Sequence, residues 1–191
     1  MREDRVMERM GVVSVIVSDA VPEKGKVRVR EFVDGVGKEE LDEGAKMEDL
    51  VYAKKVGRAV VERIELHDDD FQMVAELAVN PNDLLRYIGV SVLHRMLLHS
   101  KTILSEATSN LQFLTFLLTL YVQEVNTFVK CTLTLCVVHI IQVSYVNTDM
   151  LNKVLSTFNL PEKVIATIKQ ILSRGVTSNE IDLLESSMYL I

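Results

Sequence analysis

Histidine and cysteine are the residue types in this chain that could bind a transition metal, and their spacing argues against it. His94 and His99 are five residues apart, whereas two zinc ligands on one helix face are about four residues apart. Cys131 and Cys136 are also five apart, so on a helix their side chains would point roughly 140° from each other. His139 stands in an apolar run and is expected to be a hydrogen-bonded core histidine. We predict no metal site and no cofactor.

The two cysteines also bear on the cellular compartment. Both stand in apolar sequence, which is typical of buried, reduced thiols. Free thiols fit a reducing compartment, and the charged N-terminus has no apolar segment of the signal-peptide kind. We therefore expect an intracellular protein, cytoplasmic or nuclear.

Carboxylates could bind a cation or transfer protons, and two places in the chain have carboxylates in a setting that could allow this. The segment His67-Asp68-Asp69-Asp70 lacks the glycine and the alternate spacing of a calcium loop, so we predict a solvated helix start. Glu124 lies in a stretch that predicts a buried helix, where Gln123, Asn126 or Lys130 could pair with it. No second catalytic group, nucleophile elbow or Walker motif accompanies it. We predict that the protein is not an enzyme and name no catalytic residue.

The charge balance argues against nucleic-acid binding. Lys and Arg total 21 against 27 Asp and Glu, a net charge of −6, whereas proteins that bind the phosphate backbone are usually basic. The pair Gly35-x-Gly37 lacks the third glycine and the Lys-Ser/Thr pair of a phosphate loop. We expect no nucleic-acid partner.

A membrane span is disfavoured by the polar residues inside the most apolar region. A spanning helix needs about 20 mostly apolar residues, and the two apolar windows, Leu111–Val122 and Cys131–Val146, are both shorter. Joining them would place Glu124 and Lys130 in the bilayer, at about 2.5–3.5 kcal/mol each. We predict no membrane span and interpret the region as two buried helices.

The N-terminal section, residues 1–66, carries most of the charged residues and glycines. The β-branched run at 12–17 and the alternating run Lys26–Val33 predict the two strands of a β-hairpin. Apolar residues at spacings of three and four predict an amphipathic helix over Met47–Leu66. A two-stranded hairpin is marginally stable by itself, so we expect this section to pack on other helices or on a partner.

Partner-binding residues are predicted on the second strand of this hairpin. Arg28, Arg30 and Phe32 occupy one face of the alternating run, opposite Val27 and Val29. We predict that the three form an exposed contact surface, and that residues 12–33 contribute to an interface because strand edges need pairing.

The C-terminal section, residues 67–191, contains capping signals that predict about six helices. A helix from Ser109 or Asn110 is predicted to reach about Phe128, and a separate buried segment follows over Cys131–Tyr145. Gly175 predicts a helix end, and Thr177-Ser-Asn-Glu180 predicts a capping box. The other predicted starts are at Asp68–Asp70, Asn80-Pro81, Asn147-Thr148 and Asn159 with Pro161.

These elements predict a mainly α fold with two domains, 1–66 and 67–191. The second is expected to be an array of about six antiparallel helices, either a short α-solenoid or an orthogonal bundle. The segment Leu84–Leu172 loosely resembles armadillo and HEAT arrays in helix length and apolar density, although no repeat of fixed period is present.

Two functions of different class follow from this reading. The first is a non-enzymatic protein–protein interaction module, a subunit or adaptor of a larger assembly, bound to a protein partner or to itself as a homo-oligomer. The alternative is a helical protein that binds a small ligand or lipid in a cavity among Phe113, Phe116, Tyr121 and Phe128.

Overall fold

The computed structural model describes residues 25–36, 50–143, 148–177, 180–188 and 190. Within these residues the protein is mainly helical, with ten α-helices and two strands of two residues each, which confirms the predicted fold class. The antiparallel order of the helices stays a prediction. The chain divides into two compact units, Met1–Arg95 and Met96–Ile191. The predicted division into domains 1–66 and 67–191 also stays a prediction.

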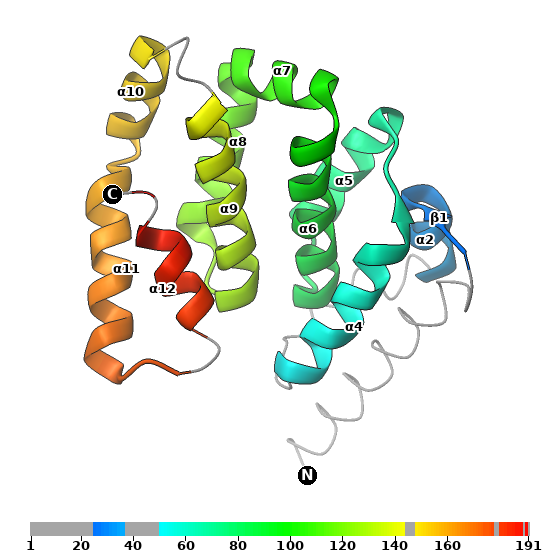
Figure 1. The fold of residues 1–191 in the computed structure, drawn as a ribbon, viewed down its shortest axis with the longest axis horizontal. Helices are drawn as coiled ribbons and strands as arrows, with labels where there is room; N and C mark the ends of the chain where they lie inside the picture. The colour runs from blue at the N-terminus through cyan, green and yellow to red at the C-terminus, as the bar shows by residue number, and fades with distance from the viewer. Residues whose placement is uncertain (1–24, 37–49, 144–147, 178–179, 189, 191) are drawn as a thin grey trace. The chain divides into compact units, whose positions relative to one another are not determined.

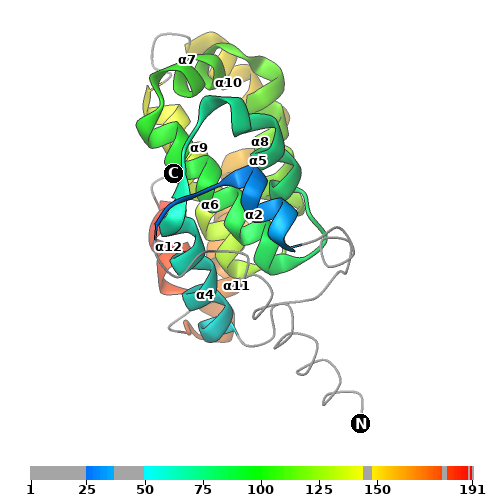
Figure 2. The ribbon, with the colours of Figure 1, turned by 90° about the vertical axis from the view of Figure 1, so that its right-hand side faces the viewer.

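Unit 1 combines a short parallel strand pair with four helices, and Figure 2 shows α2 beside α5. Strand β1 pairs with β2 in parallel, with Val27 opposite Ile64 and Arg28 opposite Glu65. The elements are β1 (Val27–Arg28), α2 (Val29–Val36), α4 (Leu50–Arg63), β2 (Ile64–Glu65), the 3-10 turn η1 (Asp68–Asp70), α5 (Phe71–Ala78) and the larger part of α6 (Asp83–His99).

The strand predicted over Lys26–Val33 is wrong beyond its first residues, because the chain becomes helix α2 at Val29. The carboxylate of Glu31 accepts a hydrogen bond from the backbone N–H of Arg28 at 3.0 Å, which is half of a capping box. Val29, Phe32 and Val36 are buried at spacings of three and four, so a helical face enters the core. The partner of β1 is β2, and the other predicted strand, 12–17, lies outside the described residues. The helix predicted over Met47–Leu66 is present as α4 from Leu50 onward.

An ion pair connects β1 to η1 across 42 residues of sequence. The Arg28 guanidinium donates from Nη2 to Asp70 Oδ1 at 3.0 Å and from Nε to Asp70 Oδ2 at 3.3 Å. Asp70 is only 4% exposed, so the predicted solvated helix start is wrong for this residue, whereas Asp68 and Asp69 are exposed. A buried carboxylate is tolerated because Arg28 neutralises it.

Helix α6 begins later than predicted. Its cap is Asn82, whose side-chain oxygen accepts from the backbone N–H groups of Leu84 and Leu85, and Asn80 instead accepts from the N–H of Asn82. Further along α6, a Cβ built on Gly89 would lie 2.6 Å from backbone atoms of Leu77 and Ala78. Only glycine permits this close approach of α6 to the end of α5.

Unit 2 is built around α9, which contacts α7, α8 and α12. Figure 1 shows α10 followed by α11 along one edge of the unit, with α12 between α11 and α9. The helices are α7 (Lys101–Ser109), α8 (Leu111–Gln123), α9 (Thr127–Val143), α10 (Thr148–Thr157), α11 (Leu160–Arg174) and α12 (Ile181–Met188). Among the residues described, no helix combines the length and apolar character that crossing a membrane requires.

The break between α8 and α9 differs from the prediction. Asn110 caps α8 as expected, by accepting from the N–H groups of Gln112 and Phe113. The helix ends at Gln123 rather than near Phe128, because Glu124 accepts from the N–H groups that follow it and Asn126 accepts from those of α9. Both side chains are therefore buried in a turn. Helix α7, with Ser100 as its cap, was not predicted.

Candidate functional site

Helix α11 presents an apolar stripe to solvent, and we call Ile165, Ile168 and Leu172 the α11 stripe. Ile165 is 38% exposed and Leu172 is 57% exposed, while Ile168 is half-buried. At about 100° per residue, Leu172 points roughly 20° and Ile168 roughly 60° from Ile165, so the three share one side of the helix. The side chains of α11 that enter the core are Leu160, Val164 and Ile171. The stripe is thus an apolar surface additional to the packed face.

The ends of α11 are fixed by the residues that the sequence predicted. Asn159 has a positive φ of 48°, which asparagine tolerates better than most residues. Pro161 stands in the first turn, where its missing N–H costs nothing. At the other end Gly175 adopts φ 83°, a value that favours glycine. These signals hold the helix, and therefore the stripe, in one register.

Two exposed apolar residues lie at the junction between the end of α11 and the start of α12. Val176 is 43% exposed and Ile181 is 52% exposed. Arg174 donates from Nη2 to Glu180 at 2.8 Å. Hydrogen bonds from the hydroxyl and the backbone N–H of Thr177, with the nearby Arg174 charge, hold the pKa of Glu180 below its ordinary value. The Glu180 half of the predicted capping box is present.

The charges on α11 favour a negatively charged neighbour. The helix contains the basic residues Lys163, Lys169 and Arg174 against one acidic residue, Glu162. Lys169 is exposed and forms no ion pair with any residue that the structure describes. At about 100° per residue, Lys169 points roughly 40° from Ile165, so a free ammonium group borders the stripe.

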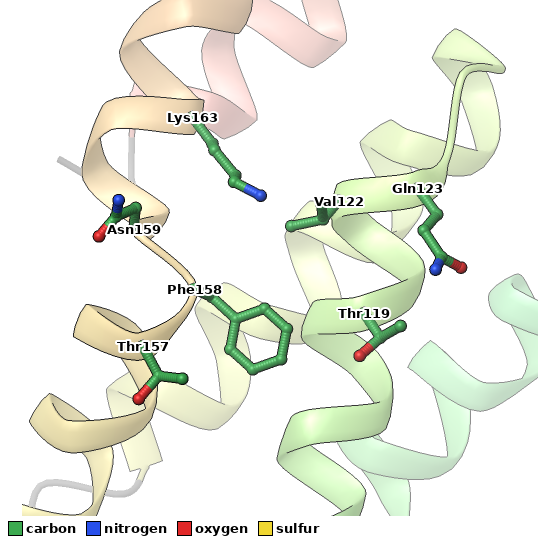
Figure 3. A pocket seen from close by; sticks show the side chains of 7 residues that line it. All are labelled: Thr119, Val122, Gln123, Thr157, Phe158, Asn159 and Lys163. Atoms are coloured by element: carbon green, nitrogen blue, oxygen red, sulfur yellow. The ribbon is translucent and has the colours of Figure 1, made fainter.

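A pocket lies on the other flank of α11, against α8. Its volume is about 300 Å³. Figure 3 shows the side chains of Lys163 and Phe158 extending toward α8, and Val122 extending back from α8 toward them. The lining residues are Thr119, Val122, Gln123, Thr157, Phe158, Asn159 and Lys163. The pocket therefore combines an apolar surface with a cationic end.

A second ammonium group lies close enough to interact with Lys163. Lys130 donates to the backbone carbonyl of Glu124 at 3.2 Å and lies 5.2 Å from the centroid of the Tyr121 ring. Burial lowers the pKa of Lys130; the charge of Glu124 opposes this shift and the charge of Lys163 adds to it. Burial likewise raises the pKa of the Tyr121 hydroxyl, which faces Thr167 without a hydrogen bond of standard geometry.

The predicted partner-binding residues do not share a face. Phe32 is fully buried, Arg28 is engaged with Asp70, and Arg30 is exposed. The strand face that was expected to present them is absent, because Arg30 and Phe32 belong to helix α2. A contact with a partner through Arg30 stays a prediction.

The other predicted residues are distributed through unit 2. Cys136 is buried as expected, and burial raises the pKa of its thiol, but Cys131 is only half-buried and lies 3.7 Å from the Ser186 hydroxyl. The buried Nε2 of His139 has no hydrogen-bond partner among the described residues, contrary to expectation. Among all residues that the structure describes, no group of three His, Cys, Asp or Glu side chains is arranged to hold a metal ion.

The aromatic cavity of the alternative function also differs in place. The Phe113 and Phe116 rings are 6.3 Å apart, and Tyr121 and Phe128 are buried. None of the four lines the pocket between α8 and α11. Local sequence patterns do not predict that pocket or the α11 stripe, because the neighbours of an amphipathic helix decide which of its side chains are exposed. Comparisons with protein-family models, curated proteins and solved structures found no match to this chain.

Proposed function

We propose that this chain is a non-enzymatic protein-interaction module, a subunit or adaptor of a larger assembly. The observation that carries the proposal is the α11 stripe, in which Leu172 is 57% exposed, on a helix that lies at the edge of unit 2 in Figure 1. Contiguous exposed apolar surface rimmed by polar residues marks interaction sites. The free thiols support an intracellular setting, cytoplasmic or nuclear.

The proposed occupant is an amphipathic helix of a different protein, with carboxylates beside its apolar face. A helix laid along the stripe would cover Ile165, Ile168 and Leu172 and place a carboxylate near Lys169. Helix recognition in this mode uses apolar anchors at such spacings. A second copy of α11 is the less favourable occupant, because α11 carries three basic residues against one acidic residue and two copies would bring like charges together.

The free energy gained by covering Leu172 determines how much partner affinity its removal should cost. Fully burying a leucine side chain stabilises by about 1.5–3 kcal/mol, and slightly more than half of Leu172 is exposed. Covering it is therefore worth about 1–1.5 kcal/mol, or about tenfold in affinity.

A matched pair of leucine variants tests the proposal. Leu172→Ser removes an anchor of the stripe, whereas Leu111→Ser removes a leucine that is 47% exposed at the start of α8. Partners are identified by mass spectrometry after affinity purification from the native host, and each is then titrated in purified form. We expect Leu172→Ser to weaken the relevant complex about tenfold and Leu111→Ser to leave it unchanged. Equal effects of the two variants would refute the proposed surface.

Light scattering separates the two kinds of partner. The purified chain is expected to remain a monomer at concentrations at which the complex forms. Self-association that Leu172→Ser abolishes would instead assign the stripe to a second copy of the chain. Lys169→Glu should weaken binding of an acidic helix, and a stronger complex would refute the charge argument.

A further inference from the structure

We propose that the pocket between α8 and the junction of α10 with α11 binds a small amphipathic monocarboxylate, such as a short-chain fatty acid. This inference is independent of the proposed function, because the pocket and the α11 stripe lie on different flanks of α11. It rests on the size of the pocket, the direction of its hydrogen-bond donors and the charges around it.

The volume limits the size of the ligand. A pocket of about 300 Å³ is at the lower end of the range for small-molecule sites. Liquid water occupies about 30 Å³ per molecule, so the pocket holds about ten non-hydrogen atoms. A carboxylate with about six carbons fits this volume, and a long-chain lipid does not.

The polar residues of the pocket do not all offer donors. The hydroxyl of Thr119 donates to the Thr115 carbonyl at 2.8 Å, and that of Thr157 donates to the Lys153 carbonyl at 2.7 Å. These hydrogens are therefore committed to the helices that carry them. The strongest remaining donor is the Lys163 ammonium group, which extends toward α8 in Figure 3.

The charges around the pocket select an anion. Lys163 forms no ion pair with a described residue, and Lys130 adds a second positive charge nearby. Glu124, the carboxylate whose charge acts on Lys130, accepts from the backbone N–H groups of Val125 and Asn126. A bound carboxylate would reduce the repulsion between the two lysines, whereas a bound amine would increase it.

The apolar residues determine where the ligand tail lies. In Figure 3 the Phe158 ring extends toward α8, and Val122 extends from α8 into the space between the helices. A carboxylate at Lys163 would place the attached alkyl chain against these two side chains. Each buried methylene contributes up to about fourfold in affinity, so chain length is a measurable variable.

Nuclear magnetic resonance titration of the ¹⁵N-labelled full chain with sodium hexanoate tests the proposal. Saturable shifts are expected at the backbone amides of Val122, Phe158 and Lys163. Butyrate, with two methylenes fewer, should bind at least fivefold more weakly. Hexylamine, with the same tail and the opposite charge, should not saturate these amides, and equal binding of hexanoate and hexylamine would overturn the proposal.

A matched pair of lysine variants tests the assigned cation. Lys163→Met should weaken hexanoate binding about fivefold, the upper range for an exposed ion pair. Lys169→Met removes an exposed lysine from the same helix outside the pocket lining and should leave binding unchanged. Both substitutions are at exposed positions, and the amide spectrum verifies the fold of each. Absence of saturable shifts in the wild type, or equal affinity in all three proteins, would contradict the assignment.

Discussion

Replacing Arg28 by methionine should destabilise unit 1, because the substitution leaves a buried carboxylate without its counter-charge. Asp70 is 4% exposed and receives two hydrogen bonds from the guanidinium, at 3.0 and 3.3 Å. Breaking a fully buried pair costs about 3–5 kcal/mol. Arg28 itself is 39% exposed, so water screens part of the charge and we expect a loss of about 2–3 kcal/mol.

Urea unfolding followed by circular dichroism measures this loss, and an exposed ion pair provides the control. Arg58 and Glu62 are 3.5 Å apart with side chains 74% and 70% exposed, so Arg58→Met should cost no more than about 0.5 kcal/mol. In a double-mutant cycle, Arg28→Met should cost much less in an Asp70→Asn background, where no charge remains to be neutralised. A loss below about 0.5 kcal/mol for Arg28→Met alone would refute the structural role and favour the partner contact that the sequence predicted.

Three further predictions concern packing, pH and thiol reactivity. Gly89→Ala should lower the free energy of unfolding by about 1–3 kcal/mol, because the added Cβ would lie 2.6 Å from the backbone of Leu77. Helix propensity alone predicts an increase. An increase would therefore show that α5 and α6 do not approach so closely. The pKa of Glu180 is lowered in the folded state. The free energy of unfolding of wild type should therefore exceed that of Glu180→Gln at pH 7, and this difference should decline below about pH 4. A difference in free energy of unfolding that stays constant down to pH 2 would contradict this. In the native protein a thiol reagent should label half-buried Cys131 before Cys136. The Cys131→Ser variant should therefore resist labelling by the reagent. Rapid labelling of that variant would place Cys136 at the surface.

Local signals in the sequence predicted the parts of the fold that depend on neighbouring residues. Asn110 and Glu180 make the predicted contacts at helix ends, and α11 ends at Gly175 as predicted. These interactions span only a few residues, so a single sequence is sufficient to identify them. The starts of α8 and α11, the helices that bear the pocket and the α11 stripe, were correctly placed for the same reason.

Signals that fit two structures gave the wrong predictions. Val27 and Val29 alternate as in a strand, but Val29, Phe32 and Val36 are also spaced as in a helix, and the helix forms because its face is buried and Glu31 caps it. Glu124 and Asn126 were assigned to a long helix because the flanking residues are apolar. Their oxygens instead accept from the backbone and end one helix before the next begins.

The candidate sites depend on residues that are distant in sequence, which is why neither was predicted. The pocket brings Thr119 and Val122 of α8 to Phe158 and Lys163, about forty residues later in the chain. The apolar residues of α11 recur at spacings of one, three and four in the sequence, yet the side chains that its neighbours cover are Leu160, Val164 and Ile171. No feature of the sequence alone separates the covered residues from Ile165 and Leu172.

Site-specific photo-crosslinking in the native host tests the central claim most directly. A photoreactive phenylalanine analogue is placed at position 172, in the α11 stripe, and in a matched protein at position 111. We predict that the probe at position 172 crosslinks one dominant protein through an acidic amphipathic helix, and that the probe at position 111 does not. The same crosslinks from both positions, or crosslinks from position 172 to this chain alone, would contradict the proposal that the stripe binds a different protein.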